Sequence, residues 1–180
     1  PEGAVRVLGD GYDPDGEVRP EGPGAAAAAA RLARAAARCV TGRPVRRNGR
    51  WAPLGDPMEV ALHVLAARCG VDVDGDTERR REVHRVPFDP ERRRTLAVVG
   101  AEVLVTGAPE AVLSLCPPVT GAAEEVERLG TGGLRVLAVA AGPAPDGDPA
   151  GAGVERLEAG LTLLGVVGLQ DPPRDGVAEA

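Results

Sequence analysis

The chain has 180 residues, of which 43% are hydrophobic and only 2% aromatic, and 27 acidic against 21 basic residues give it a net charge of −6. This length is enough for one domain of two packed layers, and the scarcity of aromatics means that Ala, Val and Leu must fill its core. The acidic balance argues against a general nucleic-acid binder, and without a signal peptide or an apolar run of about 18 residues the chain is expected to be soluble.

The N-terminal segment is expected to contain short strands on either side of a helix. Residues 4–8 alternate between apolar and polar side chains, and the Gly- and Asp-rich segment 9–16 predicts either a hairpin with a second strand at 17–18 or one strand with a long loop. The Ala-rich segment 23–40 has Pro near its start and Thr-Gly after its end, which predicts a helix. An Asn-Gly pair within 45–54 then predicts a turn between two short strands.

A second helix is expected to begin after Gly55. Asp56 fits the N-cap, Pro57 the first helical position and Glu59 the third, so the two carboxylates are expected to form a capping box that needs no ligand. Gly70 marks the end of this helix. The apolar stripe expected to be buried consists of Met58, Ala61, Leu62, Leu65 and Cys69.

The second half of the chain alternates between strand and helix patterns. Strands are expected up to Phe88 and at 95–99, 102–105, 134–140 and 161–169. Short helices are expected at 109–116 and 124–129, and the Gly- and Pro-rich segment 142–153 is expected to be a mobile surface loop. Together these patterns predict a single α+β domain over residues 1–180, with an antiparallel six- to seven-stranded sheet and helices packed on it.

The stretch Val86–Arg94 combines the only Phe of the chain with concentrated positive charge. Between Arg79 and Arg94, seven Arg stand against three acidic residues. An aromatic ring beside guanidinium groups suits a nucleotide, because the ring stacks on a base while the cations neutralise phosphate oxygens. The alternative is a core Phe that closes a strand, followed by a solvated charge run, and the pattern alone favours this alternative.

Motifs for other chemistries are missing from the sequence. It has no Walker loop, no Gly-x-Gly-x-x-Gly, no nucleophile elbow and no Lys for a Schiff base. His63 and His84 are isolated, which favours a helix-surface and a strand position over catalysis. Cys39, Cys69 and Cys116 are far apart and odd in number, which predicts reduced, buried thiols and no metal site.

Four segments, in this order, resemble the nucleotide-binding (N) domain of P-type cation-transporting ATPases. Residues 55–62, Gly-Asp-Pro-Met-Glu-Val-Ala-Leu, resemble the family's Gly-Asp-Pro-Thr-Glu-x-Ala-Leu, and residues 88–94, Phe-Asp-Pro-Glu-Arg-Arg-Arg, resemble Phe-Asp-Ser-Glu-Arg-Lys-Arg. Residues 106–110, Thr-Gly-Ala-Pro-Glu, resemble Lys-Gly-Ala-Pro-Glu, and residues 133–138 are identical to the common Gly-Leu-Arg-Val-Leu-Ala. Residues 171–174, Asp-Pro-Pro-Arg, look like the hinge that returns to the phosphorylation domain, in a form closer to the calcium, sodium/potassium and magnesium branches than to the heavy-metal branch.

The resemblance implies a site for ATP, which the parent protein would receive as MgATP. Phe88 would stack on adenine and Glu59 would accept a hydrogen bond from the adenine amino group. Arg93 would line the pocket and Arg135 would meet the phosphates. The implied nucleotide-binding residues are Glu59, Phe88, Arg93, Thr106, Gly107 and Arg135, and the implied hinge residues are Asp171 and Arg174.

The resemblance also implies that the chain acts as part of a longer pump. It would present the γ-phosphate to an aspartate on a phosphorylation domain, whose Asp-Lys-Thr-Gly-Thr motif this chain lacks, so the chain alone is expected to be inactive. Its partners would be the phosphorylation and actuator domains of the same parent, in the cytoplasm beside a bacterial plasma membrane, without contact to the membrane or to nucleic acid.

One position departs from the family pattern in a way that bears on function. The family's pocket Lys is Thr106 here, which removes a cation from the implied site. The alternative function is therefore a degenerate N domain with weak or no nucleotide binding and a structural or regulatory role. A phosphohydrolase that acts by itself is a poor third reading, because no motif bears a nucleophilic Asp.

Overall fold

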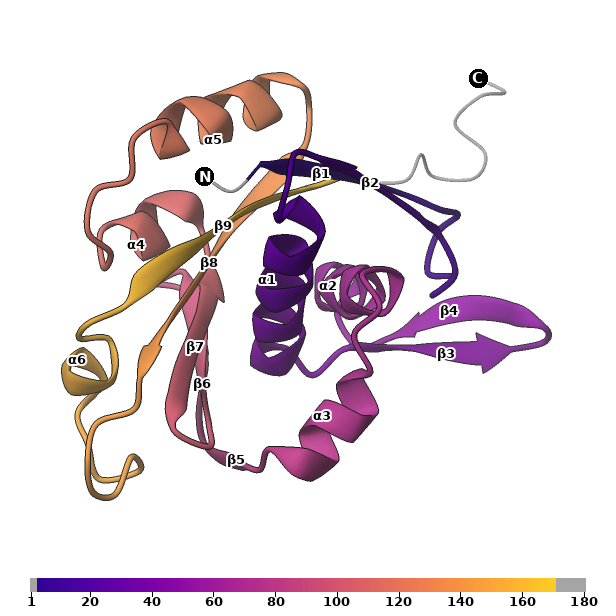
Figure 1. The fold of residues 1–180 in the computed structure, drawn as a ribbon. Coiled ribbons are helices and arrows are strands. Elements are labelled where there is room, and N and C mark those ends of the chain that lie inside the picture. Colours follow the sequence, from indigo (N-terminus) through magenta and orange to yellow (C-terminus); the bar gives the residue numbers. More distant parts are fainter. Residues whose placement is uncertain (1–2, 171–180) are drawn as a thin grey trace.

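A computed structural model describes residues 3–170, so the implied hinge residues Asp171 and Arg174 lie outside the described residues. Its central element is a five-stranded antiparallel sheet with the strand order β5-β6-β7-β8-β9 (Figure 1). The strands are β5 (Glu82–Asp89), β6 (Arg94–Val99), β7 (Glu102–Gly107), β8 (Arg135–Pro143) and β9 (Thr162–Leu169). All neighbouring strands in this order are antiparallel, so each strand begins at the end of the sheet where its neighbour finishes.

One face of the sheet is covered by a long Ala-rich helix, α1 (Ala25–Cys39), and α2 (Pro57–Arg68) packs on α1 (Figure 1). Ala side chains allow close approach of a helix to a sheet, since little volume separates the two backbones. At Gly165 of β9 an added Cβ would lie 2.8 Å from Leu32 of α1. The buried residues of this layer are Ala35, Ala36, Cys39, Leu62, Ala97, Val99, Leu104, Leu137, Val139 and Ala141.

The opposite face carries the short helices α4 (Pro109–Leu113) and α6 (Val154–Leu157), while α5 (Ala122–Thr131) contacts β8 and β9. Because both faces are covered, residues 96–99 of β6 are all buried and read as a continuous apolar run. Arg94 at the start of β6 pairs with Glu158, which directly follows α6, and this pair ties the helix to the sheet. The buried residues of this layer are Leu96, Val98, Val103, Val105, Val112, Ala138, Ala140, Leu157 and Leu161.

Two separate hairpins complete the strands. β1 (Ala4–Leu8) pairs with β2 (Glu17–Glu21), and β3 (Arg43–Arg47) pairs with β4 (Arg50–Leu54) in a hairpin that projects beyond α2 (Figure 1). Asn48 and Gly49 have φ values of 51° and 79°, and positive φ at both central residues is what a two-residue hairpin of matching twist requires. The predicted Asn-Gly turn is confirmed, and the N-terminal segment is a hairpin.

The fold confirms the predicted α+β class with an antiparallel sheet and packed helices. The main sheet has five strands, against the six or seven expected, because β1 pairs only with β2 and β3 pairs only with β4. Two short helices were not predicted, α3 (Val73–Arg79) and α6; α3 has seven residues and contains Gly75, so it lacks a readable apolar period. No helix within residues 3–170 is long and apolar enough to cross a membrane.

The predicted buried stripe of α2 is wrong in detail. Contacts with α1, α3 and the β3–β4 hairpin enclose this helix on several sides, so burial does not follow a single face. Met58 and Leu65 are only partly buried. The fully buried positions alternate along the helix and are Val60, Leu62, Val64 and Ala66.

Candidate functional site

Antiparallel pairing brings most of the implied site residues to one end of the sheet. Asp89 at the end of β5 pairs with Arg94 at the start of β6, and Arg94 pairs with Gly107 at the end of β7. Gly107 in turn pairs with Ala138, three residues after β8 begins at Arg135. Phe88, Arg93, Thr106, Gly107 and Arg135 therefore share one sheet end, although 47 residue positions separate the first from the last.

Phe88 is the most exposed large apolar side chain of this sheet end. Its exposed fraction is 60%, and it is the second-last residue of β5, just before the connection from Asp89 to Arg94. The prediction of a core Phe is therefore wrong, because the ring lies outside both buried layers of the sheet. An exposed ring at this end of the sheet is available for stacking.

Arg93 and Gly107 are held together by backbone contacts. The carbonyl of Arg93, whose φ is 52°, accepts a hydrogen bond of 2.9 Å from the amide of Ala108. A Cβ on Gly107 would lie 2.4 Å from that carbonyl oxygen, so only glycine permits this approach. The guanidinium of Arg93 forms an exposed ion pair with Glu110, which holds it at the rim of the site.

Thr106 lies deeper than the other residues at this end. Its exposed fraction is 4%, and its hydroxyl donates a 3.2 Å hydrogen bond to the carbonyl of Ala138 on β8. Its strand partner on β6 is Thr95, whose hydroxyl donates to the carbonyl of Val86 on β5. This position therefore carries a short hydroxyl side chain that is bonded within the sheet, where the resemblance implies a Lys.

Arg135, by contrast, is exposed at the first position of β8. It lies opposite Leu169, the last residue of β9. Within the described part of the chain Arg135 has no ion-pair partner. No described residue neutralises its charge, which is therefore available to an anion at this sheet end.

Glu59 holds the loop that follows α1. Its Oε2 accepts hydrogen bonds from the amide of Thr41 at 3.0 Å, the hydroxyl of Thr41 at 3.0 Å and the amide of Gly42 at 2.8 Å. Asp56 is the helix cap as predicted, since its Oδ1 accepts from the amides of Met58 and Glu59. The other half of the predicted capping box is wrong, because the Glu59 carboxylate bonds to the 41–42 loop and not to the N-cap.

Arg85 connects this loop to the sheet. Its guanidinium donates to the carbonyls of Cys39 at 2.7 Å and Arg38 at 2.9 Å, which are the last residues of α1, and it pairs with Glu82 on its own strand. The hydroxyl of Thr95 lies 3.5 Å from the Cys39 carbonyl. Glu59 is thereby joined to strands β5 and β6 through the residues that end α1, a link the sequence did not reveal.

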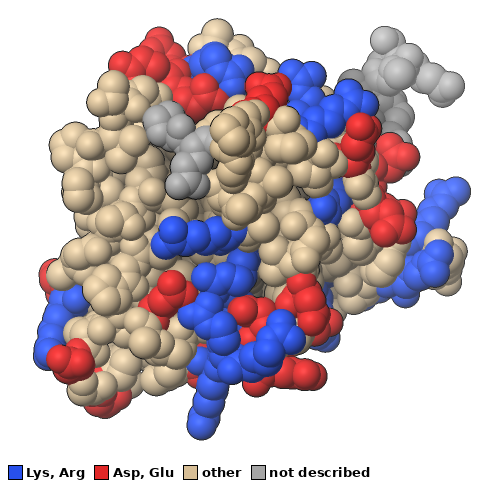
Figure 2. All heavy atoms as spheres, in the orientation of Figure 1, with Lys and Arg blue, Asp and Glu red and all other residues tan. Residues whose placement is uncertain are grey.

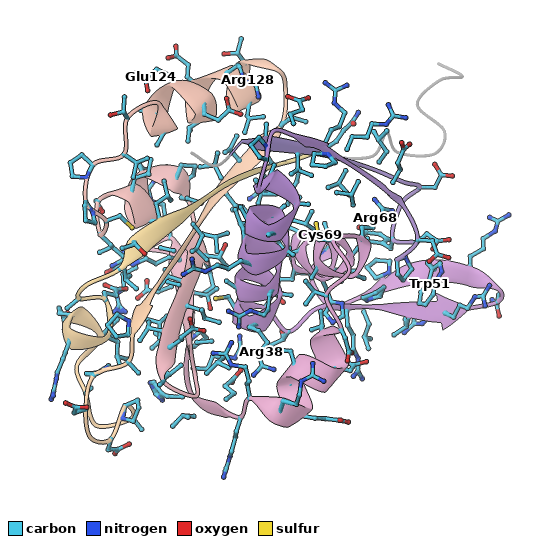
Figure 3. The ribbon with its side chains drawn as sticks, viewed as in Figure 1. Arg38, Trp51, Arg68, Cys69, Glu124 and Arg128 are labelled. Carbon is cyan, nitrogen blue, oxygen red and sulfur yellow. The ribbon has the colours of Figure 1, made fainter. Side chains whose placement is uncertain are left out.

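Five of the seven Arg between Arg79 and Arg94 form ion pairs. Figure 2 shows basic and acidic side chains mixed over the lower part of α1 and the adjacent β5 and α3. Arg80 pairs with Glu102, which Arg34 of α1 also contacts. Arg38, also on α1, lies 3.8 Å from Asp76. Figure 3 places Arg38 between α1 and α3, inside the molecule. The solvated charge run expected after Phe88 holds only in part, because Arg93 is exposed whereas the Arg94 side chain is only 15% exposed and is paired with Glu158.

Two cavities lie away from the exposed ring. One of about 380 Å³ lies at the other sheet end, beside Arg31, Glu102 and Gly142, and one of about 210 Å³ lies beneath the 41–42 loop. Neither is lined by any of the six implied nucleotide residues. His63 lines the smaller cavity half-buried, and burial lowers its pKa although Asp74 opposes this. The candidate site is thus an open sheet end, and the smaller cavity, which Thr41 and Gly42 line, is separate from it.

All three cysteines are free, as the sequence predicts, but only one of them is buried. Cys39 is buried between α1 and the sheet, and burial raises the pKa of its thiol to about 12. Cys69 and Cys116 are free but only partly buried, and burial raises the pKa of each. All three thiols are therefore protonated at neutral pH.

Comparison with known proteins decides the family. A model of the P-type ATPase cytoplasmic domain N matches residues 28–176. The chain belongs to this family. The match confirms the resemblance carried by the four sequence segments.

Relatives of this N domain are much longer than the chain. The probable cation-transporting ATPase F of Mycobacterium tuberculosis is 34% identical across 100% of the chain, which spans 22% of that relative. The calcium-transporting ATPase type 2C member 1 of Homo sapiens is 33% identical over 98% of the chain, which spans 20% of it. The sodium/potassium exporting P-type ATPase cta3 of Schizosaccharomyces pombe is 30% identical over 71% of the chain and 14% of its own length. The chain thus spans about a fifth of the first two of these relatives.

Gly42 gives a test of how tightly the N domain holds Glu59. A Cβ on Gly42 would lie 2.8 Å from the Cβ of Glu59 and 3.0 Å from the amide nitrogen of Val60, and the backbone there cannot move without disturbing α2. We expect Gly42→Ala to lower the free energy of unfolding by about 1–3 kcal/mol, as overpacking does. Urea unfolding followed by circular dichroism measures this. Gly130→Ala in α5, where an added Cβ meets nothing within 4 Å, is the matched control, and an equal effect of the two changes would contradict the close packing.

Proposed function

We propose that this N domain binds ATP and presents its γ-phosphate to an aspartate of the phosphorylation domain in a P-type cation-transporting ATPase. The observation that carries the proposal is the 60% exposed ring of Phe88, at the sheet end that also holds Arg93 and Arg135. An apolar ring exposed to water at a sheet end that also carries two cations is unfavourable for a free surface and favourable for binding a purine triphosphate.

Each residue of the site then has a role that suits its chemistry. Adenine stacks on Phe88, and its amino group donates to Glu59. Arg93 exchanges its exposed pair with Glu110 for the nucleotide at little cost, since exposed ion pairs contribute about 0–1 kcal/mol. Arg135 meets the phosphates, while Gly107 lets the backbone of the Arg93 turn approach. Magnesium arrives with the nucleotide as MgATP.

The parent's activity follows from the same proposal. The phosphorylation domain would supply the reacting aspartate, and closure of the N domain on it would bring the γ-phosphate into line. The parent would be a cation pump in a bacterial plasma membrane, with this domain on the cytoplasmic side and the phosphorylation and actuator domains as its partners. The isolated chain would bind nucleotide without hydrolysing it.

Thr106 supports a second candidate function, a degenerate N domain with a structural or regulatory role. Its hydroxyl is already bonded to Ala138, so it adds no charge-assisted contact for a phosphate. Loss of one such contact weakens binding by about tenfold to a hundredfold. Weak ATP binding is therefore part of the leading proposal, and complete loss would favour the degenerate domain.

Titration of the chain with ATP, followed by amide NMR shifts, separates the two functions. We expect ATP to shift amides near Phe88, in the 41–42 loop and at Glu59, whereas tripolyphosphate should shift only those near Arg93 and Arg135, because it lacks the base. Absence of any shift at saturating ATP in the folded chain would contradict nucleotide binding and favour the degenerate domain.

A further inference from the structure

The bonding of Glu59 is unequal between its two oxygens. All three hydrogen bonds to the carboxylate end on Oε2, and two of the three come from Thr41, through its amide and its hydroxyl. Within residues 3–170, Oε1 accepts none of the hydrogen bonds made by the protein. A carboxylate has about four acceptor positions, so Glu59 retains capacity on the side where Oε1 lies.

The donors to Oε2 are fixed in place by the fold. Gly42 is buried against the start of α2, and a Cβ on Gly55, whose φ is 106°, would lie 3.1 Å from the Gly42 Cα. Arg85 binds the two carbonyls just before the loop. The loop is therefore held from both sides, and it can orient the Glu59 carboxylate rather than follow it.

We infer that Thr41 is a positioning residue that sets the base specificity of the site by holding Glu59 through Oε2 and leaving Oε1 without a protein donor. This inference rests on the proposed function, since it concerns the base of the bound nucleotide. With Oε2 saturated by donors, Oε1 is the oxygen left for an exocyclic amino group. A purine that carries a carbonyl there would place an acceptor against an acceptor, so the site favours 6-amino over 6-oxo purines.

The same clamp makes a stronger forecast for an amide at position 59. In Glu59→Gln the three donors of Thr41 and Gly42 require the amide oxygen at the place of Oε2, which leaves the NH₂ group at the place of Oε1. The group at the place of Oε1 then donates a hydrogen bond where it formerly accepted one. The preference of the site should change from 6-amino to 6-oxo purines.

Calorimetric titration with ATP and with inosine triphosphate, which has an oxygen in place of the amino group, tests the inference. We expect the wild-type chain to prefer ATP, and Thr41→Val to reduce the ratio of the two affinities about threefold to tenfold, as loss of one hydrogen bond does. Thr41→Ser keeps the hydroxyl and should keep the ratio. Glu59→Gln should invert the preference, and adding Thr41→Val to it should diminish the inversion.

The controls distinguish this inference from the function on which it rests. Thr131→Val, at the exposed end of α5, makes the same chemical change away from the site and should leave both affinities unaltered. A Thr41→Val chain that binds ATP with an unchanged ratio would overturn the inference while nucleotide binding stands, and so would equal wild-type affinities for the two nucleotides. A folded wild-type chain that binds neither nucleotide would overturn both.

Discussion

Phe88→Ala is expected to weaken ATP binding by about fivefold to a hundredfold while the chain stays folded. Stacking of a base on an aromatic side chain contributes about 1–3 kcal/mol, and the other two aromatics, Tyr12 and Trp51, lie in the 9–16 turn and the β3–β4 hairpin. The ring is 60% exposed, so its removal leaves no cavity in either buried layer. Isothermal titration of the two chains measures the loss, and thermal unfolding monitors the fold.

Val83→Ala is the matched control for this change. Val83 is 50% exposed on the same strand, β5, at the end far from Asp89. Truncation there removes exposed apolar surface without touching the proposed site, so the ATP affinity should not change. Equal affinities of the parent and Phe88→Ala chains would refute stacking as the basis of binding.

Glu158→Ala is expected to cost the fold about 3–5 kcal/mol. Arg94 and Glu158 pair through two contacts of 2.7 Å, and the exposed fractions of their side chains are only 15% and 7%. Removal of the carboxylate leaves a guanidinium with little access to water, and an unpaired buried charge is costly. The loss should appear as a lower urea midpoint, with α6 released from the sheet.

Two further variants show whether the cost arises from the unpaired charge. Arg94→Met combined with Glu158→Leu removes both charges and should recover much of the lost stability. Glu17→Ala breaks an exposed pair with Arg19 that has the same 2.7 Å separation, and it should not move the midpoint because water replaces the partner. If Glu158→Ala behaves like Glu17→Ala, the pair is not the tie between α6 and the sheet.

The site was predictable where its residues form part of a contiguous motif. Phe88, Arg93 and Gly107 stand in segments that match the family, and strand pairing places them at one end of the sheet. The partner of Glu59 was not predictable, because Thr41 and Gly42 precede it by 18 and 17 residues and no pattern links the two segments. The nearest signal is the Thr-Gly pair that follows α1, which by itself predicts only the end of a helix.

Features that depend on a few neighbouring residues could be predicted directly from the sequence. The cap at Asp56 and the positive φ values of Asn48 and Gly49 follow from local hydrogen bonding and backbone sterics, so they could be recognised without the fold. The folded chain was needed to show which carboxylate receives which donor, that Phe88 is exposed, and that Arg94 is paired with a residue 64 positions away. The physical reason is that burial and long-range pairing depend on where separate segments of the chain return to meet, and local preference does not specify that meeting.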